Sequence, residues 1–128
     1  MPTLITQDIK IMVQARYEPA HSMPVQQQYI FSYRVKIENL GRETVQLLRR
    51  HWVITDGLGH VREVEGDGVI GQQPVIAPGE QHQYDSWSPL ATPLGHMEGA
   101  YLMRSVDTQA TFQVRIPRFE LQASTIDN

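Results

Sequence analysis

Three glycines in the stretch GDGVIG are spaced as G-x-G-x-x-G, at Gly66, Gly68 and Gly71. In dinucleotide-binding folds this spacing makes a tight turn after a strand and lets the backbone approach a pyrophosphate. A helix then follows, whose N-terminal amides face the phosphates. Here Pro74 and Pro78 follow closely and prevent a helix of useful length. The spacing therefore predicts a glycine-rich connection between strands rather than a dinucleotide fingerprint.

Loop amides can bind an anion even without a helix. We therefore keep Gly66, Gly68, Gly71 and Pro74 as a candidate binding loop, for a partner protein first and for a nucleotide or pyrophosphate second. Carboxylates in the same stretch would repel phosphate unless a divalent cation bridged them. The nearby cations are Arg49, Arg50 and Arg62, and the carboxylates are Glu63, Glu65 and Asp67.

The histidines and serines offer no recognisable catalytic or metal-binding spacing. The five histidines are His21, His51, His60, His82 and His96, and they form neither H-x-H nor H-E-x-x-H. Each is predicted to be a surface or partly buried ring, although the carboxylates near His60 could form a weak cation site. Ser86 and Ser88 lack the G-x-S-x-G elbow of a serine nucleophile. No catalytic residue, metal ligand or cofactor is predicted, and we do not expect an enzyme.

The stretch RRHW, residues 49–52, combines cations with an aromatic ring. Such a group could bind an anion or stack on a base. On a strand it is more typical of cross-strand pairs and a cation–π contact, which is the interpretation we favour.

Composition narrows the class of protein further. The 128 residues carry a formal net charge of −3 and no cysteine. A nucleic-acid binder would need a basic field, so nucleic acid is not an expected partner. The lack of cysteine fits a reducing compartment. No apolar run is long enough to span a membrane, and no signal peptide is recognised, so we expect a cytoplasmic protein.

Alternation of polar and apolar residues dominates the chain and predicts strands with one buried face. It is clearest in residues 8–17, 29–39 and 112–116, and noisier in 44–56, 60–66, 80–87 and 96–107. Within the noisy segments we expect Trp52 and Ile54 to be buried, and Tyr101 and Met103 to fill the core. Turn residues separate these segments, which together predict an antiparallel sandwich or barrel of seven or eight strands. We expect one domain over residues 1–128, with its core at about 4–121 and a loose tail at 122–128.

Several blocks together resemble the ApaG family. They are WVITDG, VEGDGVIGQQP, APGE, YDSWSPLATPLGHMEGAY and FQVRIPRFEL, and the resemblance covers nearly the whole chain. His82 stands where many members carry an apolar residue. The resemblance implies an immunoglobulin-like sandwich of the fibronectin type III sort. It also implies a link by genetics to cobalt and magnesium efflux, and a role as a protein-binding module, with no catalytic residues to carry over.

We therefore predict a non-catalytic binding module whose protein partner the sequence does not identify. Its expected contact surface joins the glycine loop, residues 66–74, to the SPLATPLG loop, residues 88–95. On this hypothesis a bulky residue at Gly68 impairs partner capture and leaves the thermal unfolding midpoint nearly unchanged. The sequence does not indicate an oligomeric state.

Overall fold

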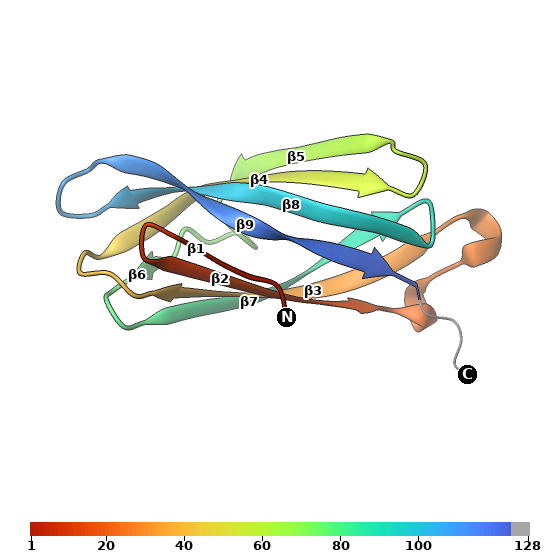
Figure 1. Cartoon of the computed structure of the whole chain (residues 1–128), viewed down its shortest axis with the longest axis horizontal. Helices are drawn as coiled ribbons and strands as arrows, with labels where there is room; N and C mark the ends of the chain where they lie inside the picture. Colours follow the sequence, from red (N-terminus) through yellow and green to blue (C-terminus); the bar gives the residue numbers. More distant parts are fainter. Residues whose placement is uncertain (124–128) are drawn as a thin grey trace.

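Two antiparallel β-sheets packed face to face make up the protein in the computed structural model, which describes residues 1–123 (Figure 1). The first sheet, sheet A, has the strand order β1-β2-β3-β7, and the second, sheet C, has the order β5-β4-β8-β9, with β6 pairing with β4. The bounds of the strands of sheet A are β1 Thr3–Thr6, β2 Ile9–Tyr17, β3 Tyr29–Asn39 and β7 Gln81–Leu90. Those of sheet C are β4 Val45–Asp56, β5 Val61–Asp67, β6 Val75–Ile76, β8 Leu94–Ser105 and β9 Thr111–Gln122.

The predicted antiparallel sandwich is confirmed, with nine strands in the described residues rather than seven or eight. The two additional strands, β1 and β6, are four and two residues long, too short for an alternating pattern to reveal them. At the other end of the chain the predicted tail starts too early. Gln122 is the last residue of β9, and Ala123 packs partly buried against the core. Residues 124–128 lie outside the described part of the chain.

The core forms where the inward faces of the two sheets meet, because alternate residues of each strand point to the same side. Trp52 and Ile54 are buried as predicted, and Tyr101 and Met103 are completely enclosed. The Trp52 ring lies at the centre of an aromatic cluster, with its centroid 5.3 Å from that of Tyr33 and 5.8 Å from that of Phe119. Such tilted and edge-on contacts add to the stabilisation that burial of the rings provides.

A β-bulge in β4 explains why alternation in residues 44–56 is noisy. Leu47 pairs with Met103 and Arg49 pairs with Leu102, so one extra residue, Leu48, is inserted into the strand. A bulge of this kind reverses the phase of the alternation that follows it. As a result Arg50, which pairs with Tyr101, lies on the inward face together with the buried Trp52 and Ile54.

The connection between β2 and β3 contains two single-turn 3-10 helices, η1 at Pro19–His21 and η2 at Pro24–Gln26. Pro19 and Pro24 each stand at the start of their helix, where the missing amide hydrogen costs no hydrogen bond. No helix in residues 1–123 is long and apolar enough to cross a membrane.

Candidate functional site

The glycine loop is fastened to β4 by Arg50. Gly66 pairs with Arg50 across the sheet, and a Cβ atom at Gly66 would lie 2.9 Å from the Arg50 guanidinium nitrogens. The missing side chain therefore leaves the space that the guanidinium occupies. Nη1 of Arg50 donates to the carbonyls of Asp67 and Gly68, both at 3.0 Å. Arg49 beside it forms an ion pair with Asp67 (2.6 Å). Arg50 thus hydrogen-bonds to two carbonyls of the loop, and Arg49 binds the Asp67 carboxylate.

Several amides of the loop are already used within the fold. The Gly68 amide donates to the Leu48 carbonyl (2.8 Å), and Val69 and Gln72 exchange amide–carbonyl bonds of 2.8 and 3.0 Å. A phosphate cradle needs consecutive amides pointing at the anion. Here Gly68 and Val69, which follow the first glycine, point at carbonyl oxygens instead. These amides therefore close a turn within the fold and are not directed at an anion.

The remaining glycines and proline of the motif have structural positions. Gly68 has a φ of +63°, and a Cβ atom there would lie 2.2 Å from the Gln72 carbonyl oxygen. Gly71 has a φ of +71°, is exposed, and has open space where a Cβ would be. Pro74 is half-buried, and its carbonyl accepts a hydrogen bond from the Leu47 amide (3.0 Å). This geometry argues against the expectation that a bulky residue at Gly68 leaves stability unchanged.

The two loops that were predicted to form one contact surface lie at opposite ends of β4. The glycine loop hydrogen-bonds to Leu48, whereas the Thr92 hydroxyl of the other loop accepts from the Gly57 amide just beyond the end of β4 (2.8 Å). Leu48 and Asp56 are eight residues apart on the strand, which corresponds to roughly 26 Å. The prediction of a joint surface is therefore wrong (Figure 1).

Three side chains that could hold a cation meet on the outer face of sheet C. His51 Nε2 lies 2.7 Å from a Glu63 carboxylate oxygen and 3.5 Å from a Glu65 oxygen, and the three candidate ligand atoms lie within 4.8 Å of one another. The sequence grouped Asp56, Glu63, Glu65 and Asp67 with His60. In the structure His60 lies 3.4 Å from Asp56, whereas Glu63 and Glu65 lie at His51. The strand register, which pairs His51 with Glu65, is the signal that would have found the group. Both carboxylates are exposed, and as they stand these contacts join β4 to β5.

A different feature stands out on sheet A: a hollow of about 620 Å³ on its outer face. We call it the Trp87 hollow. It is lined by residues of β2, β3 and β7 and of the turn that follows β2, among them Gln14, Arg16, Glu18, Arg34, Asp85 and Trp87. Trp87 is 51% exposed, and the His21 ring packs edge-on against it with centroids 5.1 Å apart. A large aromatic ring is thus held in place and left half open to solvent.

Ordered polar groups surround the ring. Nε of Arg34 donates to Asp85 (2.8 Å), and this hydrogen bond lowers the pKa of the Asp85 carboxyl. The Ser32 hydroxyl donates to Glu18 (2.6 Å). The hollow therefore offers an aromatic surface beside donors and acceptors of both charges. Sequence reasoning did not select Trp87, although it shares the outward-facing register of Asp85 in QHQYDSWS.

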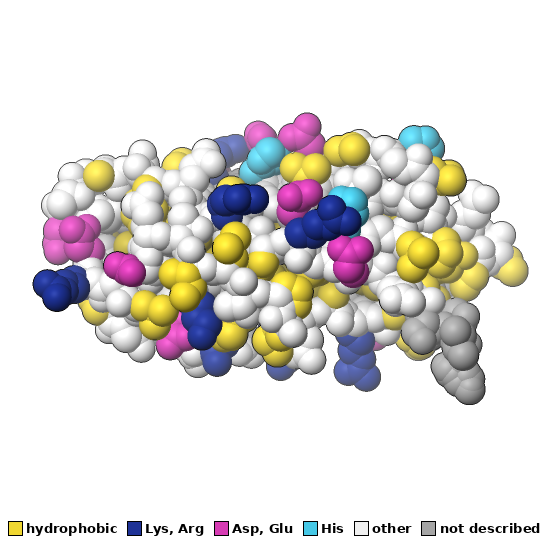
Figure 2. All heavy atoms as spheres, in the orientation of Figure 1, with side chains coloured by type: hydrophobic (Ala, Val, Ile, Leu, Met, Phe, Trp, Pro, Cys, Tyr) yellow, Lys and Arg dark blue, Asp and Glu magenta, His cyan; other side chains and the backbone are white. Residues whose placement is uncertain are grey.

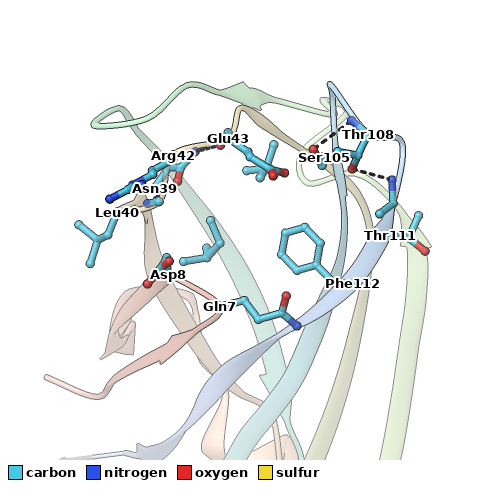
Figure 3. A pocket seen from close by; sticks show the side chains of 14 residues that line it. Gln7, Asp8, Asn39, Leu40, Arg42, Glu43, Ser105, Thr108, Thr111 and Phe112 are labelled. Carbon is cyan, nitrogen blue, oxygen red and sulfur yellow. Dashed lines mark hydrogen bonds between the residues drawn. The ribbon is translucent and has the colours of Figure 1, made fainter.

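A second hollow, of about 580 Å³, lies at one end of the sandwich (Figure 3). Figure 3 shows Asn39 and Glu43 on one side, Ser105 and Thr108 on the other, and Phe112 between them. The buried Asn39 is fully engaged by the protein itself. Its amide donates to the Glu43 carbonyl (2.8 Å) and the Ile76 carbonyl (3.0 Å), and its oxygen accepts from the Gly41 amide (2.9 Å). Its side chain stabilises the connecting loops and leaves no buried polar atom for a ligand.

Comparison with known proteins gives a consistent result. A family model described as the ApaG domain matches residues 19–105. A Protein ApaG from Acidithiobacillus ferrooxidans is 47% identical over 119 residues, covering 93% of each chain. Another, from Pseudomonas paraeruginosa, is 50% identical over 113 residues, covering 88% of this chain and 89% of that one. The crystal structure of an ApaA protein from Bordetella pertussis is similar with a TM-score of 0.88, at 44% identity and 98% coverage of both chains.

Proposed function

This chain belongs to the ApaG family, and we propose that it acts as a non-catalytic module that binds another protein. The observation that carries the proposal is the half-exposed Trp87 in the hollow of sheet A. Tryptophan and arginine are enriched among the residues that dominate protein–protein binding energies. A polar rim commonly surrounds the core of such an interface. Trp87, Arg34 and Arg16 provide this combination on one face.

The polar groups of the core support a binding role rather than catalysis. In residues 1–123 no serine hydroxyl is hydrogen-bonded to a histidine, and the buried Ser88 hydroxyl has no partner. The hydroxyls of Tyr84 and Tyr101 bond to each other inside the core, and burial raises the pKa of both phenols. Nucleophilic catalysis needs a nucleophile, a base and an orienting group that meet at an accessible point. These hydroxyls lie inside the fold instead.

The nucleotide hypothesis is weaker than the sequence suggested. It depended on loop amides facing a phosphate, and those of Gly68 and Val69 are bonded to carbonyls. It also depended on arginines directed at the ligand, and Arg50 is directed at the loop's own carbonyls. We therefore favour a protein partner over a nucleotide.

Affinity capture with a matched pair of variants tests the proposal. Trp87→Ala removes the aromatic surface, and Leu58→Ala removes a side chain that is 75% exposed in the turn between β4 and β5. Immobilised wild-type protein and each variant are incubated with cytoplasm from the native host, and retained proteins are quantified by mass spectrometry. We expect one or a few proteins to be lost with Trp87→Ala and kept with Leu58→Ala. Equal retention by both variants would contradict the proposal.

A further inference from the structure

The four sheet edges differ in how they are protected against strand pairing. Folded proteins blunt exposed edges with charges, prolines, bulges or short strands. β1 is only four residues long. β9 contains the buried Pro117, has a bulge opposite Met97 and Gly99, and packs against β1 and β2. Figure 2 shows the side of the molecule on which β9 lies, with positive and negative side chains interspersed. β5 carries Arg62, Glu63, Glu65 and Asp67 along seven residues.

β7 lacks most of these devices. It is ten residues long and pairs on one side with β3, and its other side pairs with no strand in residues 1–123. It contains no lysine or arginine, and its only proline, Pro89, is the last residue but one. Its single carboxylate, Asp85, is already paired with Arg34. Apart from the Pro89 carbonyl, which accepts from Arg62, backbone groups along this edge are therefore available to another extended chain.

We propose that β7 accepts an extended, acidic segment of the partner protein as an additional strand of sheet A. This inference rests on the proposed protein-binding function and specifies how the partner binds. In strand addition, main-chain hydrogen bonds supply affinity and the neighbouring side chains supply specificity. On the outer face the added strand would run beside Trp87, which favours an apolar side chain there.

The acidic character follows from an arginine on the seam between β7 and β5. Arg62 lies on the inward face of sheet C, at the register position opposite Ile54. Arg62 reaches across the seam and donates to the Pro89 carbonyl of β7 (3.0 Å). Arg62 is exposed and forms no ion pair with a carboxylate in the described residues. Its positive charge is therefore available to a carboxylate of a bound segment, whereas Arg50 is engaged by the glycine loop.

The position of Arg62 sets where a carboxylate is expected. Successive side chains of an added strand point to opposite faces. An acidic residue that reaches Arg62 therefore faces the seam, and the residues on either side of it face the Trp87 side. Arginine–carboxylate pairs are among the stronger and more specific polar contacts.

An NMR titration with a defined peptide tests the inference. The probe is a peptide of about nine residues that alternates valine and glutamate, and the control alternates valine and lysine; this length matches the ten residues of β7. We expect saturable amide shifts and slowed hydrogen exchange along Gln81–Leu90 with the acidic peptide only. N-methylation of every second peptide amide removes the hydrogen-bond donors along one edge of the peptide. Methylation along the edge that pairs with β7 should abolish binding, and methylation along the opposite edge should not.

Variants separate this inference from the proposed function. Arg62→Gln should weaken binding of the acidic peptide by about tenfold, the cost of one charge-assisted contact. Arg118→Gln, on the opposite edge in β9, is the control and should leave it unchanged. Shifts absent at millimolar peptide, equal shifts with the lysine peptide, or shifts outside β7 would overturn the inference. If β7 stays silent while Trp87→Ala still abolishes capture, only the inference fails. If β7 responds but capture does not depend on Trp87, the proposed site fails instead.

Discussion

Replacing Gly68 by alanine should destabilise the protein far more than the same change at Gly71. Both glycines have left-handed backbone conformations, with φ of +63° and +71°. They differ in what a new methyl group meets. At Gly68 it would lie 2.2 Å from the Gln72 carbonyl oxygen, and at Gly71 nothing lies within 4 Å. The comparison therefore separates backbone strain from the close approach of the loop to itself.

The two costs can be estimated from the geometry. A non-glycine residue in this region of φ costs about 1 kcal/mol, which is the whole expected effect at Gly71. At Gly68 the methyl group must also displace the Gln72 carbonyl and so break its hydrogen bond from the Val69 amide. Losing that bond and leaving buried polar groups unpaired adds about 1–3 kcal/mol. The expected total at Gly68 is therefore about 2–4 kcal/mol.

Thermal unfolding measures the difference directly. For a domain of this length, 1 kcal/mol corresponds to about 4 °C in the unfolding midpoint. We expect Gly71→Ala to lower the midpoint by about 4 °C and Gly68→Ala by about 8–16 °C. Equal shifts, or an unchanged midpoint for Gly68→Ala, would refute the view that the loop is a structural turn and would restore the hypothesis of an adaptable binding loop.

Three further outcomes follow from the contacts of the glycine loop and of buried or partly buried side chains. Arg50→Met should lower the free energy of unfolding by about 1–3 kcal/mol because two loop carbonyls lose their donor. Arg49→Ala removes an exposed ion pair and should change it by at most about 1 kcal/mol; urea unfolding of both variants checks this. Tyr84→Phe and Tyr101→Phe should each cost about 1–3 kcal/mol by orphaning the other hydroxyl, and a double-mutant cycle should show the double variant to be less destabilised than the sum. Burial lowers the pKa of His82, so its contribution to stability should be complete above the unfolded-state pKa of about 6.5 and be lost as the pH falls through the lower folded-state pKa. Thermal midpoints of His82→Leu should therefore fall less than those of the wild type between neutral and mildly acidic pH.

The strands could be predicted from the sequence where the alternation of polar and apolar residues was regular. In β2 and β3 apolar residues alternate with few exceptions, so the buried Ile11 and Val35 could be assigned to inward faces. β4 was harder because its bulge reverses the phase of the alternation and brings Arg50 inward. A bulge depends on the partner strand, and local periodicity carries no information about it.

The candidate site was harder to predict because it depends on long-range register. The glycine spacing identified a real loop, but the direction of its amides is set by Leu48 and Gln72, which hydrogen-bond to it. Trp87 belongs to a strand whose outward face only becomes a hollow when β2 and the η1 turn lie beside it. Its place in the hollow therefore follows from topology rather than from any motif.

Photo-crosslinking in the native host tests the central claim most directly. A photoreactive phenylalanine analogue in place of Trp87 reports what lies against the hollow of sheet A, and the same analogue in place of Leu58 serves as the control because that side chain is exposed at 75%. We predict one dominant protein adduct at position 87 that is absent at position 58 and that maps to an acidic, extended segment of the partner. No protein adduct at position 87, or the same adducts from both positions, would contradict the account of this protein as a binding module that acts through sheet A.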